Sequence, residues 1–366
     1  MVADFSIVST PILVGLATVT ISVLSIAIWQ RRRLHWWGEV LIGILLVVLL
    51  ATNGAAWLNR HFDYYPTFDD LLGRRATDQA AISSLRSRKV PRRGVVVEIP
   101  IPGSISGFHA LPAQVYVPPA WFESPRPKLP VIELLPGVPG QTSDWTRAGF
   151  ADVTMDAYAK QHGGRAPIVV MADENGDTLN DTECVDSKLG NVEQYLTVDV
   201  PAFIEKRFGA AATPQQWAIA GLSEGGMCAL MLSLRNPDVY RTFGDYSGLV
   251  GPRSGDTNRP GTTVTDLFGG DRVAFAAHEP SLLLRTHSYP ELGGWFEVGS
   301  LDSDPLAAQR LLVTQARAAG IDTCAVTIPG GEHTFQVWAQ AFRDSLPWIA
   351  GRLGITGPIE CPHPGR

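Results

Sequence analysis

The short segment Gly221-Leu222-Ser223-Glu224-Gly225 constrains the fold of this chain more than any other feature. It follows an apolar run, Trp217-Ala218-Ile219-Ala220, and precedes a helical pattern. A G-x-S-x-G sequence in this setting is typical of a sharp strand-to-helix turn that lifts one serine hydroxyl above a sheet. The flanking glycines suit that turn, because Cβ atoms there would collide where strand and helix cross closely. The motif alone is weak, so its interpretation depends on the segments around it.

Short apolar segments alternate with helical patterns along most of the chain. The segments expected to form strands are residues 95–99, 113–117, 130–135, 168–171, 217–220, 295–298 and 325–328. Those expected to form helices are residues 145–161, 192–208, 225–235, 305–319 and 334–353. This alternation predicts an α/β fold with a doubly wound, mostly parallel sheet that begins with one antiparallel pair. Residues 251–292 fit no strand–helix unit, and we expect an insertion over the active-site edge of the sheet.

The N-terminal part has a different composition. Pro11–Trp29 and Val40–Leu58 are each 19 residues without a charged side chain, which is long enough to span a bilayer. Arg31-Arg32-Arg33 lies between them, and tryptophans occur near the ends of both runs. A cleaved signal peptide fits less well, because the extreme N-terminus has no Lys or Arg and the first run is long. We therefore predict a transmembrane hairpin of two spans over residues 1–60.

This hairpin sets the expected organisation and location of the protein. The positive-inside rule places the three arginines in the cytoplasm and everything after residue 60 outside the cell. A polar connector over residues 61–93, helical in part between 68 and 87, then leads to an α/β domain over 94–354 and a tail over 355–366. We expect a multi-pass protein of the cell membrane whose α/β domain is extracytoplasmic.

Charge and cysteine content narrow the possible partners. Beyond residue 60 the chain carries 26 basic and 34 acidic side chains, a net charge of −8, so nothing in it recruits nucleic acid. Its cysteines have no C-x-x-C spacing, so a zinc or thioredoxin-like site has little support. Four cysteines outside the membrane allow three disulfide pairings. We favour Cys184 with Cys228, which leaves Cys324 and Cys361, because the first two should lie near the same sheet edge.

A serine nucleophile needs a base to take its proton and an acid to orient that base. In folds with this strand-to-helix turn, the acid and then the histidine follow the serine, each on a loop after a strand. Of the four downstream histidines, only His333 directly follows an expected strand. His278 and His287 lie in the insertion and His363 lies in the tail. The order therefore predicts that Ser223 acts with His333.

The acid is expected in the turn after residues 295–298, where Asp302 and Asp304 both qualify. Asp304 directly precedes Pro305 and is the better N-cap for the next helix. This consideration favours Asp302 as the residue that orients the histidine.

A tetrahedral intermediate would also need two backbone N–H groups aimed at its negative charge. One is expected from Glu224, the residue after the serine, and the other from the turn Gly137-Val138-Pro139-Gly140. Because Pro139 has no N–H, Val138 is the preferred donor and Gly137 is the next choice.

Acidic side chains are concentrated in residues 173–186. Their spacing is not that of an EF-hand, because the glycine and the distal glutamate are misplaced. We expect a polar active-site loop in which Asp173 and Glu174 bind substrate hydroxyls or amines, with a calcium site as the alternative. Trp145 is assigned to substrate binding with them, and neither a metal nor a cofactor is expected.

Taken together, these residues resemble the esterase branch of the α/β-hydrolases, which includes esterase D-like enzymes and mycobacterial mycolyltransferases, in a membrane-anchored actinobacterial form. The likeness covers residues 95–353 and is sharpest over 195–204, 219–226 and 330–333. It implies an acyl-enzyme mechanism that uses Ser223, Asp302 and His333. Many members have Met after the serine, where this chain has Glu224. If the Glu224 carboxylate lines the pocket, it favours a cationic or hydroxyl-rich substrate. The alternative is that Glu224 is a solvated surface residue.

We therefore expect a serine carboxylic-ester hydrolase that acts on acyl or aminoacyl esters of the cell envelope. One alternative is an acyltransferase that passes the acyl group to a sugar or lipid. The other is a non-catalytic envelope binding protein on a hydrolase fold.

Overall fold

The computed structural model describes residues 7, 9–30, 35–62, 64–65, 67, 71, 85, 89–255 and 257–361. The chain divides into two compact units, residues 1–76 and residues 77–366. Each unit is described here by itself. The arginines at 31–33, His363 and most of the expected connector helix at 68–87 lie outside the described residues.

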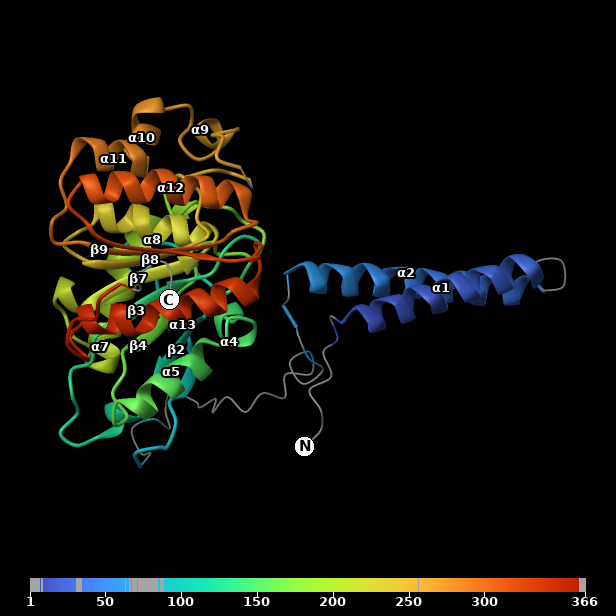
Figure 1. The fold of residues 1–366 in the computed structure, drawn as a ribbon, viewed down its shortest axis with the longest axis horizontal. Coiled ribbons are helices and arrows are strands. Elements are labelled where there is room, and N and C mark those ends of the chain that lie inside the picture. Colours follow the sequence, from blue (N-terminus) through green and yellow to red (C-terminus); the bar gives the residue numbers. More distant parts are fainter. Residues whose placement is uncertain are drawn as a thin grey trace. The chain divides into compact units, whose positions relative to one another are not determined.

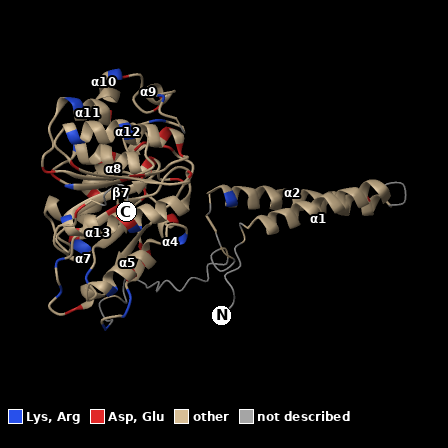
Figure 2. Ribbon diagram, viewed as in Figure 1, with Lys and Arg blue, Asp and Glu red and all other residues tan. Residues whose placement is uncertain are grey.

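The first unit contains two long apolar helices, α1 (Thr10–Gln30) and α2 (Trp36–Phe62), which contact each other (Figure 1). Asn53 of α2 donates a side-chain hydrogen bond to Thr20 of α1 (2.9 Å), and Arg60 donates one to Thr10 (3.0 Å). Figure 2 shows that both helices contain almost no charged residues. By length and composition both are able to cross a membrane, and none of their described residues is buried.

The second unit is built on an eight-stranded sheet in the order β1-β2-β4-β3-β7-β8-β9-β10. Strand β1 (Val95–Ile99) pairs antiparallel with β2 (Ala113–Val117), and β2 pairs antiparallel with β4 (Ile168–Met171). From β4 onward every pairing is parallel. The other parallel strands are β3 (Val131–Leu135), β7 (Trp217–Leu222), β8 (Thr242–Tyr246), β9 (Gly293–Gly299) and β10 (Asp322–Ile328). The predicted mostly parallel sheet with a leading antiparallel pair is confirmed.

Helices cover both faces of this sheet (Figure 1). On one face α8 (Glu224–Arg235) packs against β3, β7 and β8, and α12 (Ser303–Ala318) packs against β9 and β10. On the other face α13 (Phe335–Arg352) packs against β8, β9 and α5 (Ala151–Gln161). The strands are almost entirely buried and rich in β-branched residues, as expected for parallel strands with helices on both sides.

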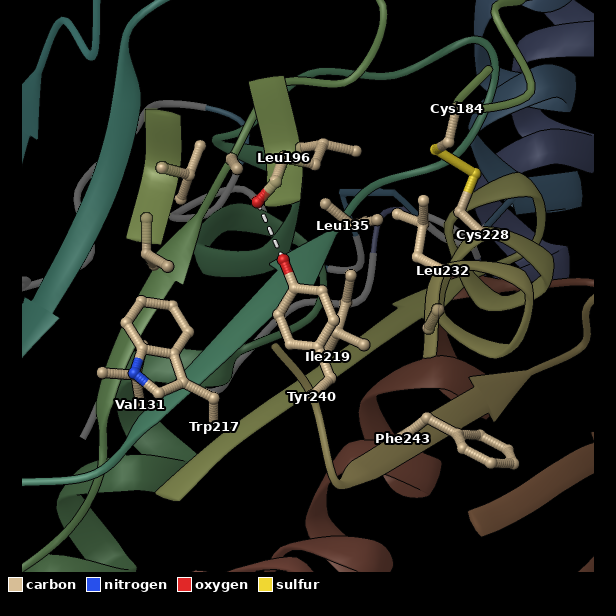
Figure 3. Packing of buried hydrophobic residues seen from close by; sticks show 14 of the residues in the cluster. Val131, Leu135, Cys184, Leu196, Trp217, Ile219, Cys228, Leu232, Tyr240 and Phe243 are labelled. Carbon is tan, nitrogen blue, oxygen red and sulfur yellow. Dashed lines mark hydrogen bonds between the residues drawn. A yellow bond between two sulfur atoms is a disulfide. The ribbon is translucent and has the colours of Figure 1, made fainter. Parts of the chain in front are cut away.

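One large apolar cluster fills the face that carries α8 and α12 (Figure 3). It also includes apolar residues of α7 (Val200–Phe208). Tyr240 is fully buried in this cluster and donates its hydroxyl toward Leu196 O (2.8 Å) and Glu133 Oε2 (2.8 Å). Such bonds are needed because a buried polar group without a partner is costly.

Local structure departs from the expected elements in several places, three of them in the main sheet and its flanking helices. Strand β8 was not predicted, because its sequence places a glycine and an aspartate in the middle of the strand. The helix expected at 145–161 is split into α4 (Asp144–Arg147) and α5, with Phe150 in the left-handed region at φ 52°. The helix expected at 192–208 is divided into α6 (Val192–Gln194), a π-helical turn (Tyr195–Asp199) and α7.

The segment expected to be an insertion, residues 251–292, contains three short helices. They are α9 (Thr263–Asp266), α10 (Arg272–Ala276) and α11 (Pro280–Thr286), and α11 packs against α8 and α12. The buried leucines of this segment, Leu267, Leu284 and Leu292, join the apolar cluster on the face of α8 and α12. Near Asn258, the segment contacts Asp304 in the turn after β9.

Two disulfides join the four cysteines. Cys184 pairs with Cys228, as favoured from the sequence, and Cys324 pairs with Cys361. The second disulfide attaches the tail, at Cys361, to the edge strand β10.

Candidate active site

Ser223 lies in a strained turn between β7 and α8. Its backbone has φ 53° and ψ −118°, a conformation that non-glycine residues rarely adopt. The surrounding glycines make the turn possible: a Cβ on Gly221 would collide with Gly225 O, and one on Gly225 would collide with Pro136 O. The turn is also fixed to the neighbouring strand, because Ser223 N donates to Tyr246 O (2.8 Å). This geometry is that of the strand-to-helix turn predicted from the motif.

His333 lies between Ser223 and Asp302. Its Nε2 is 2.9 Å from Ser223 Oγ, and its Nδ1 is 2.7 Å from Asp302 Oδ2. Asp302 is 7% exposed, whereas the His333 side chain is 37% exposed, so the acid is enclosed and the base is open to solvent. The indole of Trp338 meets the imidazole edge-on with 4.8 Å between ring centroids, which limits how the ring can turn. The structure thus brings together the three side chains selected from chain order.

The two candidate acids have different partners. Asp302 occupies the N-cap position of α12, yet its side chain makes no capping bond and instead accepts from His333. Asp304 lies inside the helix and receives hydrogen bonds from the backbone and side chain of Asn258. The prediction that Asp304 caps the helix was therefore wrong, although the choice of Asp302 as the partner of His333 agrees with the geometry.

The other downstream histidines that the structure describes lie elsewhere. His278 has Nε2 3.3 Å from Glu193 Oε2, and His287 is exposed at the end of α11.

The glycine-rich turn after β3 lies directly against Ser223. A Cβ built on Gly137 would be 2.8 Å from Leu222 Cδ1 and 3.1 Å from Ser223 Cβ, so a larger residue there would press on Leu222 and on the nucleophile. Val138 is partly exposed beside it and is joined to Pro139 by a cis peptide bond. The residues predicted to supply N–H groups to an oxyanion, Gly137, Val138 and Glu224, therefore lie on two segments that meet at the nucleophile.

The three residues assigned to substrate binding are buried. Trp145 is 0% exposed; its indole N–H donates to Leu135 O (2.8 Å) and its ring packs near Phe342 and Tyr246. Its assignment was wrong, because the ring belongs to the core.

Asp173 is also buried, and its carboxylate accepts the backbone N–H groups of Leu111, Asn175 and Gly176. Glu174 is buried as well, with Oε1 3.5 Å from Asn175 Nδ2. Both carboxylates are thus enclosed in the loop, contrary to the prediction that they bind substrate. Within the described residues, no group of three or more His, Cys, Asp or Glu side chains is arranged to hold a metal ion.

Glu224 is half-buried and turns its carboxylate toward the acidic loop. Oε1 accepts the backbone N–H of Glu183 (2.9 Å) and Oε2 accepts from Asn175 Nδ2 (2.9 Å). Burial and the charge of Asp181 raise the pKa of Glu224 to about 8, although these two hydrogen bonds act in the opposite direction. Burial and the charge of Glu224 likewise raise the pKa of Glu174 and of Glu183. The side chain is therefore neither a free pocket carboxylate nor a solvated surface group.

Asn175 and Asn258 were not predicted from the sequence, although each donates hydrogen bonds to an acidic residue next to the site. Asn175 connects Glu224 to the acidic loop, and Asn258 holds Asp304. Each partner lies more than 40 residues away in the chain, so no local pattern marks either asparagine.

Comparisons with known proteins agree with this arrangement. The family model described as Putative esterase matches residues 109–349. An uncharacterized protein of Corynebacterium glutamicum is 36% identical over 336 residues, which cover 87% of this chain and 77% of that protein.

Two solved structures share the fold of the second unit. A ferulic acid esterase superposes with a TM-score of 0.62 at 19% identity, covering 72% of this chain and 99% of the other. An S-formylglutathione hydrolase from Agrobacterium tumefaciens superposes with a TM-score of 0.60 at 20% identity, covering 72% and 97%. The chain therefore belongs to the Putative esterase family and has the α/β-hydrolase fold.

Proposed function

We propose that the protein is a serine carboxylic-ester hydrolase in which Ser223, His333 and Asp302 form the catalytic triad. The single observation that carries this proposal is the position of His333, whose two ring nitrogens lie within hydrogen-bond distance of Ser223 Oγ and Asp302 Oδ2. A serine needs such a base, and the base needs such a partner to hold its tautomer. The family membership supports ester chemistry.

The steps follow from this geometry. Ser223 Oγ attacks the ester carbonyl carbon while its proton passes to His333 Nε2, and Asp302 stabilises the imidazolium that forms. The N–H groups of Glu224 and of Val138 or Gly137 donate to the oxyanion of the tetrahedral intermediate. That intermediate collapses to an acyl-enzyme, and His333 returns the proton to the departing alcohol. Water, deprotonated by His333, then attacks the acyl carbonyl and releases the acid and the free serine.

The proposed substrates are acyl or aminoacyl esters of the cell envelope. The two apolar helices support a membrane location, where the local concentration of such esters is high. We further propose that α1 and α2 span the membrane and that the second unit is extracytoplasmic.

The test is turnover of p-nitrophenyl acetate and butyrate by the full chain in detergent micelles. The variant Ser223→Ala should reduce turnover to background, a loss of at least about 10⁴-fold, because the other groups cannot replace the nucleophile. A fluorophosphonate should label Ser223 in the unaltered protein by displacement of fluoride and should leave the variant unlabelled. Unimpaired turnover in the variant would refute the proposal. Product analysis with glycerol or trehalose present distinguishes water from an alcohol as acyl acceptor.

A further inference from the structure

Two neighbouring residues of the acidic loop are attached to one face of α8. Glu224 and Cys228 are four residues apart and therefore lie above one another on that helix. Glu224 accepts the backbone N–H of Glu183, and Cys228 forms a disulfide with the next residue, Cys184 (Figure 3). The loop is thus fixed to the helix that begins at the nucleophile by two attachments on successive turns.

The backbone at this attachment is strained. Glu183 and Cys184 have φ angles of 52° and 54°, both in the left-handed region. For a non-glycine residue this conformation costs about 1–2 kcal/mol, and two such residues in succession are unusual. Such backbone conformations persist only where surrounding contacts hold them. Here the contacts with Glu224 and Cys228 do so.

Asn175 connects the rest of the acidic loop to the side chain of Glu224 through hydrogen bonds. Its Nδ2 donates to Glu224, its Oδ1 accepts from Thr182 N (3.0 Å), and its carbonyl accepts from Asn180 (3.0 Å). Thr182 in turn donates its hydroxyl to Glu174 O (2.8 Å). Residues 174–183 therefore form a closed, internally bonded loop that the Glu224 carboxylate attaches to the helix, next to the disulfide at Cys184.

The same loop is bonded to the glycine-rich turn after β3. Gly140 N donates to Thr178 O (3.2 Å), at the outer part of the loop. The loop thus contacts both segments that supply oxyanion donors in the proposed mechanism: the start of α8 and the turn that contains Gly137 and Val138.

We propose that Glu224 is a positioning residue whose carboxylate, together with the Cys184–Cys228 disulfide, holds residues 173–184 as a brace that contacts both sources of oxyanion N–H groups. This inference rests on the proposed function, because it assigns a role in stabilising the oxyanion. Glu224 therefore contributes twice, by its backbone N–H toward the oxyanion and by its side chain toward residues 173–184. The side chain itself does not touch the substrate.

The expected fall in kcat is smaller than that caused by a lost donor and at most equal to that caused by a misplacement of about 1 Å. Removal of one oxyanion donor costs about 10²–10³-fold in kcat, and a 1 Å misplacement costs about 10²-fold. Glu224→Leu fills the space but accepts no hydrogen bond, so kcat should fall about 10- to 100-fold while KM changes little. Glu224→Gln keeps one acceptor oxygen and should be intermediate, which makes it the conservative rescue.

The experiment measures kcat and KM for p-nitrophenyl acetate, melting temperature, and inhibition by a trifluoromethyl ketone, whose adduct with Ser223 carries an oxyanion. In Glu224→Leu the inhibition constant should rise in step with the loss of kcat/KM, because both depend on the oxyanion donors. Asn175→Ala should have a similar effect, and the double variant should be no worse than either, since both residues act through one loop. Glu98→Gln, on an exposed position of β1, is the control and should match the unaltered protein.

The outcomes are distinguishable. Wild-type kcat and inhibition in Glu224→Leu would overturn the inference while leaving the proposed function intact. So would a fall in kcat without weaker inhibition by the ketone, or additive effects with Asn175→Ala. Absence of Ser223-dependent turnover in the unaltered protein would instead refute the proposed function itself.

Discussion

The two ends of α8 are held by one stretch of chain, residues 173–194, with opposite chemistry. At the N-terminal end the helix supplies the carboxylate of Glu224, which accepts from Glu183 and Asn175. At the C-terminal end the helix supplies donors, and Arg235 and the next residue, Asn236, donate to the Glu193 carboxylate (2.9 Å each). The helix dipole favours negative charge at the first end and positive charge at the second.

The pKa of the carboxyl group nevertheless shifts in opposite directions at the two ends of the helix. Burial and a neighbouring acid raise the pKa of Glu224 to about 8. Burial also acts to raise the pKa of Glu193, but hydrogen bonds from His278, Arg235 and Asn236 outweigh it and hold this pKa at about 2. The end beside Ser223 therefore keeps its carboxylate in an unfavourable setting, whereas the far end gains stability from its own. We expect variants near Ser223 to affect rate and variants near Arg235 to affect stability.

The largest effect should come from the acid that holds His333. Asp302→Asn keeps the shape but removes the charge and favours the wrong tautomer of the imidazole, so kcat should fall about 10³–10⁴-fold. Its melting temperature should change little. Asp304→Asn is the matched control and should stay within a few fold, because Asp304 is bonded to Asn258 and not to His333. An equal loss of kcat in both variants would show that activity depends on the conformation of this turn rather than on the Asp302 carboxylate.

The next effect concerns the disulfide at the middle of α8. The two disulfides close loops of similar length, with separations of 44 and 37 residues. Loop entropy alone predicts that loss of either destabilises the protein by about 4 kcal/mol. Only Cys184→Ala/Cys228→Ala should also lower kcat, because only that disulfide holds the loop beside Ser223. Both double variants are tested by unfolding in urea and by kcat measured below their melting temperatures. An equal fall of kcat in Cys324→Ala/Cys361→Ala would contradict the prediction that only the Cys184–Cys228 disulfide affects the rate.

The smallest effect concerns the far end of α8. Glu193→Gln removes charge-assisted hydrogen bonds and should destabilise the protein by about 1–3 kcal/mol at pH 7 without changing kcat. Because folding lowers this pKa from 4.5 to about 2, the stabilisation is present above pH 4.5 and is lost as the pH falls toward 2. The difference in unfolding free energy between the two proteins should therefore shrink at pH 3. A difference independent of pH would point to packing rather than charge.

The sequence predicted the elements around the site better than the contacts between them. Ser223 and His333 were selected because strand ends and chain order are local signals, and the parallel sheet brings such ends to one edge. Asp302 was selected by eliminating Asp304 as a cap, whereas the structure uses Asn258 to engage Asp304. Strand β8 was missed because its central Gly244 and Asp245 break the apolar pattern.

Burial was the main source of error. Asp173 and Glu174 were expected to meet substrate because acidic side chains usually face water. Here the loop folds back on itself, so backbone N–H groups surround the Asp173 carboxylate. Trp145 shows the same error for an aromatic side chain. Long-range partners such as Leu111 decide these environments, and no pattern within the loop encodes them.

The strand order also matters for the design of fusion proteins. Strands β1 and β10 are the two edges of the sheet, seven neighbour spacings apart, which at about 4.8 Å per spacing is roughly 34 Å. The tail is tied to the β10 edge through Cys361, whereas the chain that follows α2 enters at the β1 edge. A fluorescent reporter or affinity handle joined after Cys361 would therefore follow the β10 edge, whereas one placed directly before β1 would follow the opposite edge of the sheet.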